Sequence, residues 1–235
     1  MPIPVPWDTT PSLPSQMRPS EETMPQQPLF VGNPALIVVD IQRGSAAPGA
    51  ESGIPHMPGA LGRIARAERL VAAARAAHVP VVFFQEVHRR SGIDFGRELD
   101  GTETAHCIDG DPATELWPSL RPEEGEYHIV KRRYSGFFGT EFEVLLRGLS
   151  VSTLVLIGGL TDVCVHYTFV DAHQRDYYVR VAEDCVGGST EARHLASLDA
   201  MEYLQAGARR STQEIIDAFT ALAAGGALTA TGATL

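Results

Sequence analysis

Short apolar runs alternate with segments of helical spacing along most of the chain. Residues 35–39 form a continuous apolar run, which is the pattern of a strand covered on both faces of a sheet. Residues 59–77 carry apolar positions at helical spacing, and residues 79–84 return to a strand pattern. Strands that alternate with helices are typical of a parallel sheet. The pattern therefore predicts an α/β fold, a three-layer α/β/α sandwich around a mostly parallel sheet of about six strands.

The same reasoning predicts the remaining elements of this domain. Further strands are expected at residues 126–130, 153–157, 177–182 and 208–211. Further helices are expected at residues 141–147, 163–175, 190–205 and 212–222. The stretch 85–125 is long and rich in Gly and Asp, and loops of that length usually serve function.

The two ends of the chain lack this periodicity. Residues 1–33 contain eight prolines and are expected to form an extended arm, partly polyproline II, with a disordered tail as the equal alternative. If the arm is ordered, we expect it to lie on its own domain or on a neighbouring subunit. Residues 224–235 are small and polar and are expected to be a flexible tail, which leaves residues 34–223 as one domain.

Composition excludes several classes of partner. Hydrophobic residues make up 44% of the 235 residues, enough for a sizeable core, and the net charge of −10 disfavours nucleic acid or an anionic membrane as the main partner. No apolar run reaches the roughly 18 residues of a membrane span, and no secretory signal is evident. Three cysteines without a CxxC pair predict neither a disulfide framework nor a zinc finger, and they fit the reducing cytoplasm.

Three reactive residues follow predicted strands. Asp40 ends the first strand, Lys131 ends the strand at 126–130, and Cys164 lies beyond two glycines where a helix is expected to start. Each has an ordinary explanation alone: a turn aspartate, a solvated lysine in a basic run, or a packed cysteine. Ligands of open α/β sheets bind beyond the carboxyl ends of the strands, so we expect the three to meet. Together they supply a base, a cation and a nucleophile.

The segments around these residues resemble the isochorismatase-like cysteine hydrolases. The matching segments are Ala-Leu-Ile-Val-Val-Asp-Ile-Gln at 35–42, Val-Lys-Arg-Arg-Tyr-Ser-Gly-Phe-Phe-Gly-Thr at 130–140, and Gly-Gly-Leu-Thr-Asp-Val-Cys-Val at 158–165. The resemblance implies a catalytic triad of Asp40, Lys131 and Cys164. It also implies a non-proline cis peptide, which we place at Leu160–Thr161.

The chemistry that this resemblance implies is amide hydrolysis through a thioester. Asp40 would accept the Cys164 proton, Lys131 would stabilise the charges, and the N–H groups of Cys164 and of Leu160 or Thr161 would form the oxyanion hole. Vinyl-ether hydrolases of the family lack this cysteine, so its presence favours C–N cleavage.

The segment that begins at Lys131 resembles most closely the ureidoacrylate and biuret amidohydrolases, which cut small ureido or carbamoyl substrates. Arg133 is a candidate clamp for a substrate carboxylate, with a surface or interface ion pair as the alternative. Phe137, Phe138 and Tyr167 are candidate pocket walls, with core packing or a subunit contact as the alternative.

A second resemblance, to the nicotinamidases, concerns a metal. That family carries Asp-x-His and a later His-Cys, where this chain has Glu86-Val-His88 and His106-Cys107. Glu86 replaces the acid, and the next expected histidine falls near Asp94. Glu86, His88 and His106 are therefore candidate ligands for a divalent metal. The favoured expectation is no cofactor and a polar pocket wall, where His88 or His106 hydrogen-bonds the substrate or a loop. Glu86 and His88 are candidate substrate-binding residues.

The sequence thus predicts a cysteine-dependent amidohydrolase of a small non-peptide amide, ureide or carbamoyl compound that releases ammonia or an amine. The alternatives are a nicotinamidase-like, metal-assisted amidase and a non-catalytic protein of the same fold that binds a small molecule. Redox sensing by Cys164 alone leaves Asp40 and Lys131 without a role. Family members often assemble as dimers or tetramers, so the resemblance also implies a homo-oligomer.

Overall fold

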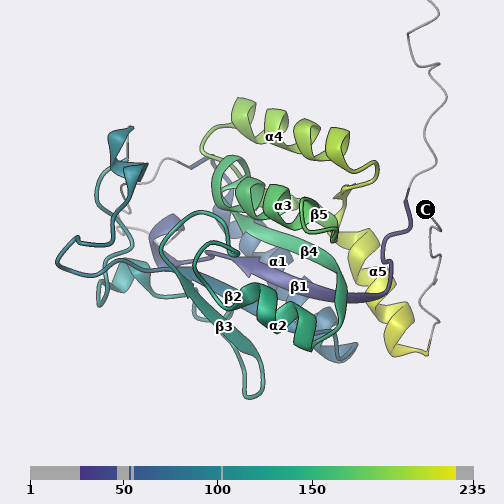
Figure 1. The fold of residues 1–235 in the computed structure, drawn as a ribbon. Helices are drawn as coiled ribbons and strands as arrows, with labels where there is room; N and C mark the ends of the chain where they lie inside the picture. The colour runs from purple at the N-terminus through teal and green to yellow at the C-terminus, as the bar shows by residue number, and fades with distance from the viewer. Residues whose placement is uncertain (1–26, 47–52, 54–55, 102, 226–235) are drawn as a thin grey trace, which may run out of the picture.

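A sheet of six strands forms the centre of the molecule (Figure 1). The structure is a computed structural model that describes residues 27–46, 53, 56–101 and 103–225. The strand order is β3-β2-β1-β4-β5-β6, and every pairing between these strands is parallel. The strands are β1 Asn33–Val39, β2 Val81–Glu86, β3 Tyr127–Lys131, β4 Val151–Gly159, β5 Tyr178–Gly187 and β6 Arg209–Arg210. The predicted fold class is confirmed.

Helices cover both faces of this sheet. They are α1 Ala60–Ala76, α2 Phe142–Gly148, α3 His166–His173, α4 Glu191–Leu204 and α5 Thr212–Ala223. Helices α1 and α5 pack on one face, while α2, α3 and α4 pack on the other (Figure 1). None of the helices in the described part of the chain is long and apolar enough to cross a membrane.

The central strand β1 explains why the sheet is buried on both sides. Its Leu36 and Val38 side chains belong to the apolar cluster beneath α1 and α5, whereas Ile37 and Val39 belong to the cluster beneath α2, α3 and α4. Successive side chains of a strand point to opposite faces, so a strand between two helical layers must be apolar at every position. The unbroken apolar run in the sequence is therefore the mark of the middle layer.

Two strands extend further than the sequence pattern predicts. The glycines at 158 and 159 continue β4, and β5 runs past Glu183 and Asp184 to Gly187. The register between the two strands shifts along this stretch, with Leu156 opposite Val181. This irregularity accommodates the polar pair that interrupts the apolar pattern. The longer strands carry the backbone to the edge of the sheet where the site lies.

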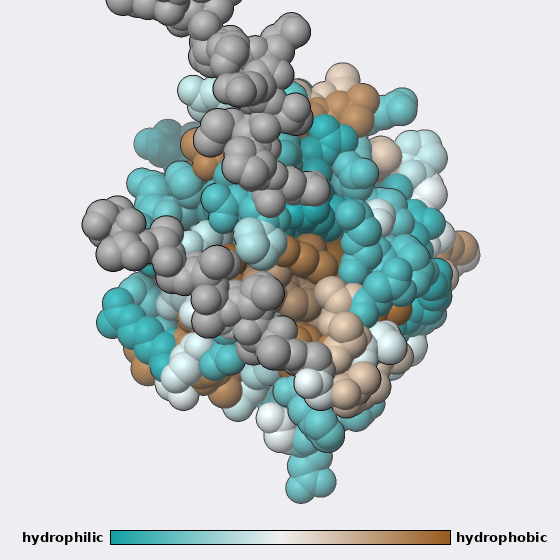
Figure 2. All heavy atoms as spheres, turned by 90° about the vertical axis from the view of Figure 1, so that its right-hand side faces the viewer, coloured by the Kyte–Doolittle hydropathy of each residue, from teal (hydrophilic) through white to brown (hydrophobic). Residues whose placement is uncertain are grey.

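The last residues of the predicted arm pack against the domain. Phe30 is buried and stacks on Phe219 of α5, with ring centroids 5.2 Å apart. The Arg180 guanidinium donates hydrogen bonds to the carbonyl oxygens of Pro28 and Leu29. Residues 1–26 of the predicted arm and residues 226–235 of the predicted tail lie outside the described residues. Figure 2 shows the side of the molecule where the strands begin, with polar side chains around a central apolar area.

Gly158 has a conformation that only glycine adopts without strain. Its φ is +108°, and a Cβ at this position would lie 2.0 Å from the carbonyl oxygen of Val39 on the neighbouring strand. We expect Gly158→Ala to lower the free energy of unfolding by about 2–4 kcal/mol, because strain and a backbone clash add.

Chemical denaturation of this variant is compared with that of Gly148→Ala. Gly148 ends α2, and an added Cβ there meets nothing within 4 Å. The control should stay within about 1 kcal/mol of the unsubstituted protein. Equal losses in the two variants would contradict the explanation.

Candidate active site

Three charged side chains converge at the carboxyl edge of the sheet. Asp40 directly follows β1 with a φ of +49°, Glu86 ends β2, and Lys131 ends β3. The register places Glu86 opposite Lys131. Because parallel neighbouring strands end at the same edge, residues more than forty positions apart in the chain become direct neighbours in space.

Lys131 is the centre of this group. Its ammonium nitrogen lies 2.7 Å from Asp40 Oδ2, 2.9 Å from Glu86 Oε2 and 3.4 Å from Cys164 Sγ. It also donates a hydrogen bond of 3.1 Å to the carbonyl oxygen of Arg133. The side chain is fully buried. A buried ammonium is costly without compensation, and here two carboxylates and a carbonyl supply it.

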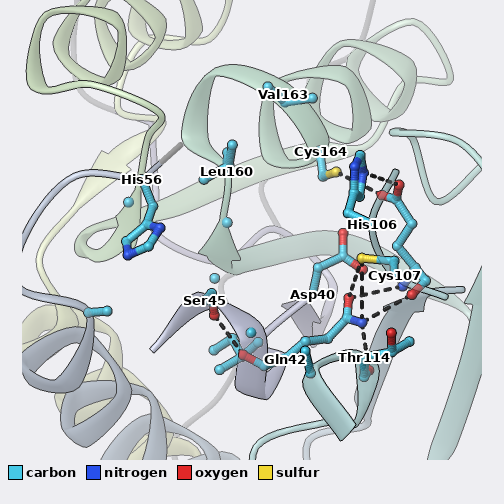
Figure 3. A pocket seen from close by; sticks show the side chains of 18 of the residues that line it. Asp40, Gln42, Ser45, His56, His106, Cys107, Thr114, Leu160, Val163 and Cys164 are labelled. Carbon is cyan, nitrogen blue, oxygen red and sulfur yellow. Dashed lines mark hydrogen bonds and ion pairs between the residues drawn. The ribbon is translucent and has the colours of Figure 1, made fainter. Parts of the chain in front are cut away.

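Cys164 reaches the group from a π-helical turn, Thr161–Val165, between β4 and α3. Its Sγ and carboxylate oxygens of Asp40 and Glu86 all lie within 4.8 Å of one another. Figure 3 shows Asp40 and Cys164 entering the same cavity from different elements. The structure therefore brings together the predicted triad of Asp40, Lys131 and Cys164.

The cis peptide precedes the predicted position by one residue. It joins Gly159 to Leu160, so the prediction of Leu160–Thr161 was wrong. The reason is that β4 continues to Gly159, which pairs with Gly187 of β5, and the turn begins directly after that pair.

Polar contacts hold the turn in place. The Asp162 carboxylate accepts hydrogen bonds from the backbone N–H and the hydroxyl of Ser189, and Thr161 Oγ1 lies 2.9 Å from His194 Nδ1. The backbone N–H groups of Leu160 and Thr161 donate no hydrogen bond to another described residue. Leu160 and Cys164 line the cavity, whereas Thr161 is absent from its wall. The turn thus presents unused donors beside the sulfur.

The cavity has a volume of about 160 Å³. Its polar wall residues share a position at the carboxyl edge of the sheet or in the loops above it. They include Asp40, Gln42, His56, Arg63, Glu86, Glu103, His106, Cys107, Tyr134 and Cys164. Apolar side chains fill the space between them, among them Ile41, Ile64, Leu160 and Val163. Such a cavity suits a small organic molecule with polar groups at its ends.

Burial and charge set the protonation states of the site. Burial raises the pKa of the Cys164 thiol well above its usual value; Lys131 opposes this effect, and the carboxylates of Asp40 and Glu86 add to it. Burial also raises the Asp40 pKa, against the opposing effect of Lys131. The thiol is therefore protonated at rest, and Asp40 is a stronger base than an exposed aspartate.

Glu86 behaves differently from Asp40. Burial raises its pKa, but the Lys131 charge and the hydrogen bonds of His106 and His88 outweigh burial and hold the pKa well below its usual value. For Lys131, burial lowers the pKa, but Asp40, Cys164 and Glu86 together hold it well above the usual value. The resting site thus contains an ammonium, an ionised Glu86 and a neutral thiol.

Besides His88, four predicted substrate-binding residues do not line the cavity. The Arg133 guanidinium donates to the backbone carbonyls of Asp94 and Arg132. Phe137 belongs to the apolar core, where its ring packs 4.7 Å from Phe142. The remaining two, Phe138 and Tyr167, are exposed on the surface. In the segment that follows Lys131, only Tyr134 lines the cavity, which the sequence pattern does not reveal.

The candidate metal ligands form a hydrogen-bonded cluster around Glu86. His88 Nε2 lies 3.2 Å and His106 Nε2 3.5 Å from Glu86 Oε1, while the other carboxylate oxygen contacts Lys131. Glu86, His106 and Cys107 do bring possible ligand atoms within 4.8 Å of one another. A divalent cation there would share its carboxylate with the Lys131 ammonium and be repelled by it. The Lys131 charge therefore disfavours a divalent cation at these residues.

Glu86 and His88 differ in their access to the cavity. Glu86 lines it, as predicted for a substrate-contacting residue, whereas His88 is fully buried behind it and stacks on Phe95 at 4.2 Å. His106 lines the cavity and fixes its own ring by a 2.7 Å hydrogen bond between Nδ1 and the carbonyl oxygen of Thr104.

Two features of the site escaped the sequence analysis. Gln42, two residues after Asp40, donates to the carbonyl oxygens of Glu86 and Thr114 and so ties the loop above the cavity to β2. Lys131 is the only lysine in the chain, since the other 18 of its 19 Lys and Arg residues are arginines. An ammonium retained in a chain that otherwise uses only guanidinium is a signal for a position that needs a compact charge.

Comparison of the sequence with known proteins assigns this chain to a family of hydrolases. Residues 34–215 match the isochorismatase domain. The chain belongs to the isochorismatase family. It is 34% identical over 187 residues to a ureidoacrylate amidohydrolase of Methylobacterium radiotolerans, covering 71% of this chain and 72% of that protein. It is also 30% identical over 173 residues to a maleamate amidohydrolase of Pseudomonas putida, covering 72% of this chain and 79% of that protein.

A solved structure extends the likeness to three dimensions. The N-carbamoylsarcosine amidase of Thermoplasma acidophilum superposes with a TM-score of 0.66 at 28% identity, over 77% of this chain and 96% of that one. The sequence-based assignment to the family is thereby confirmed. This isochorismatase-family member is a hydrolase that acts on C–N bonds other than peptide bonds.

Removing the Lys131 charge should make Cys164 less acidic. We expect Lys131→Met to shift the pH at which iodoacetamide labels Cys164 to higher values, because Lys131 alone opposes the rise in its pKa. Labelling is followed by mass spectrometry of the peptide that contains Cys164.

The control is Arg97→Met, which removes the same charge from a side chain that is 94% exposed. It should leave the labelling profile unchanged. A profile that is also unchanged in Lys131→Met would show that Lys131 does not influence the thiol.

Proposed function

We propose that this isochorismatase-family hydrolase is a cysteine-dependent amidohydrolase. It cleaves the C–N bond of a small amide, ureide or carbamoyl compound through a thioester on Cys164 and releases ammonia or an amine. The single observation that carries the proposal is the Lys131 ammonium, which contacts Asp40, Glu86 and Cys164, three residues that line a cavity of molecular size.

The first step makes the nucleophile. Asp40 Oδ1 is buried and has no hydrogen-bond partner among the described residues, so it can accept a proton. When a substrate carbonyl lies beside Cys164, the thiol proton moves to Asp40. Lys131 offsets the negative charge that this transfer leaves on sulfur. The thiolate then forms a bond to the carbonyl carbon, and the carbonyl oxygen becomes an oxyanion.

The turn and Asp40 complete the reaction. Backbone N–H groups of Leu160 and Cys164 stabilise the oxyanion, which makes the N–H of Leu160 rather than that of Thr161 the partner of Cys164. The oxyanion collapses, the C–N bond breaks, and Asp40 gives its proton to the leaving nitrogen. Asp40 next takes a proton from water as the hydroxide attacks the thioester. The Cys164 thiolate leaves and regains that proton from Asp40.

The substrate class rests on size and on relatives. The cavity of about 160 Å³ fits a compound of a few heavy atoms. The relatives are named for ureidoacrylate, maleamate and N-carbamoylsarcosine, which are small amides or ureides. These names support the same class for this chain.

We propose that the reaction needs no metal, because Glu86 is committed to Lys131 and to two imidazoles. A nicotinamidase-like, metal-assisted reaction is therefore disfavoured. A purely binding role gives the buried base, cation and thiol no purpose. We further propose a homo-oligomer that works in the reducing cytoplasm, where the three free cysteines remain thiols.

Cys164→Ala should abolish turnover without unfolding the protein. The experiment measures ammonia release from a panel of ureidoacrylate, biuret, nicotinamide, maleamate and N-carbamoyl amino acids. Removing the acyl acceptor should reduce the rate on the best substrate by about 10³-fold or more. Circular dichroism and thermal unfolding verify that the variant is folded. Turnover at the original rate in a folded Cys164→Ala variant would refute the proposal.

Glu86→Gln should alter the pH dependence of the rate. Removing the Glu86 charge lowers the Asp40 pKa, so the acid limb of the pH profile for kcat/KM should move to lower pH. We also expect kcat to fall about tenfold or more, since Lys131 loses one of the contacts that position it.

Glu98→Gln is the matched control. Glu98 is a buried acid of the same cluster that contacts His88 at 3.5 Å. It should change neither the profile nor kcat by more than about threefold. An identical response of both variants would argue for a general packing effect instead of the proposed role of Glu86.

A further inference from the structure

Among the residues that the structure describes, Arg63 is the only arginine in the wall of the cavity. It belongs to α1, which lies on the face of the sheet opposite α3. Lys131 is a second permanent cation of the site, because it contacts the wall residues Asp40, Glu86 and Cys164 although it does not line the cavity itself. The mechanism uses Lys131 and leaves Arg63 without a role.

The guanidinium of Arg63 lies against Gly187, the last residue of β5. A Cβ on Gly187 would come 2.4 Å from Arg63 Nε and 2.7 Å from its Cζ, so glycine makes room for the planar group. Gly187 pairs with Gly159, where the turn to Cys164 begins. Neighbouring strands lie about 4.8 Å apart, so Arg63 stands roughly one strand spacing from the strand that leads to Cys164.

The two cations flank the nucleophile from opposite sides. In the strand order, Lys131 ends β3 on one side of β1 and β4, and Arg63 covers the end of β5 on the other. A substrate whose carbonyl carbon meets Cys164 therefore extends toward Arg63. Apolar wall residues such as Ile64 and Val163 accompany it.

The charge of Arg63 has no acidic partner among the residues that the structure describes. Its Nη1 and Nη2 donate to the carbonyl oxygens of Pro58 and Met57, at 2.8 and 2.9 Å. By contrast, Arg66 on the next turn of α1 faces the carboxylate of Asp184. The two carbonyl bonds fix the orientation of the Arg63 fork while no acid among the described residues offsets its positive charge, which favours an anionic ligand.

We propose that Arg63 binds a carboxylate of the substrate, so that the substrates of this enzyme are short amides or ureides with a carboxylate a few bonds from the amide that is cut. The inference rests on the proposed function, because it extends the same cavity. It assigns to Arg63 the carboxylate clamp that the sequence suggested for Arg133, whose guanidinium is held by backbone carbonyls outside the cavity.

The first experiment measures binding without catalysis. Succinate and maleate are tested for protection of Cys164 from iodoacetamide, with labelling of the Cys164 peptide as the readout. Both anions should protect the unsubstituted enzyme, and Arg63→Gln should weaken protection by about tenfold or more, as expected for loss of a charge-assisted hydrogen-bonded pair. Arg66→Gln removes the same charge one turn away and should leave protection unchanged.

The second experiment compares turnover of matched substrates. N-carbamoylglycine and maleamate are compared with their neutral analogues, N-carbamoylglycinamide and maleamide. Arg63→Gln should raise KM for the carboxylates by about tenfold or more and change KM for the neutral analogues by less than about threefold. KM of Arg63→Lys for the carboxylates should lie between those of the unsubstituted enzyme and Arg63→Gln, because an ammonium keeps the charge and lacks the planar pair of donors.

Gly187→Ala offers an independent test that keeps the charge. The added methyl group displaces the guanidinium and should lower the preference for carboxylates in the same direction as Arg63→Gln. The inference is overturned if neither anion protects Cys164. It is also overturned if Arg63→Gln leaves protection by the anions unchanged, or if it changes KM for the carboxylates and KM for the neutral analogues by the same factor. Such results leave the Cys164→Ala test untouched, so failure of this inference and failure of the proposed function remain distinguishable.

Discussion

The buried ammonium of Lys131 is the contact on which the site depends. Moving an ion of this kind out of water costs several kcal/mol of free energy even after relaxation, so nearby charges and hydrogen bonds must compensate for it. Asp40 and Glu86 do so from β1 and β2, and both can reach Lys131 only if the three strands are parallel and in this order. The strand order of the fold is thus what places the two carboxylates that stabilise the buried charge.

The same contact separates the roles of the two carboxylates. Glu86 also receives hydrogen bonds from two imidazoles, which keep it ionised, whereas Asp40 lacks this support and its pKa is raised by burial. An acid that is always charged can balance Lys131, and an acid with a raised pKa can exchange protons. Similar side chains therefore serve different purposes because their neighbours differ.

Family membership and geometry answer different questions about this enzyme. The relatives establish hydrolysis of a non-peptide C–N bond. The structure adds the positions of two cations, with Lys131 beside the Cys164 sulfur and Arg63 beyond the strand that leads to it. A small molecule held between them would be oriented by the Arg63 charge at one end and by its contact with Cys164 at the other.

The sequence by itself determined the layer architecture, because apolar runs between helical periods fit only strands buried on both faces. It also identified Asp40, Lys131 and Cys164, since each directly follows or ends a recognisable strand or turn. Tertiary structure alone decided the contacts between residues that are distant in sequence, namely the contact of Glu86 with Lys131 and the place of Arg63 over Gly187. It also removed Arg133, Phe137, Phe138 and Tyr167 from the cavity, although they lie near the triad residues in sequence. The physical reason is that periodicity reports which face of an element is buried, whereas the direction of a chain after a strand end depends on packing between distant segments.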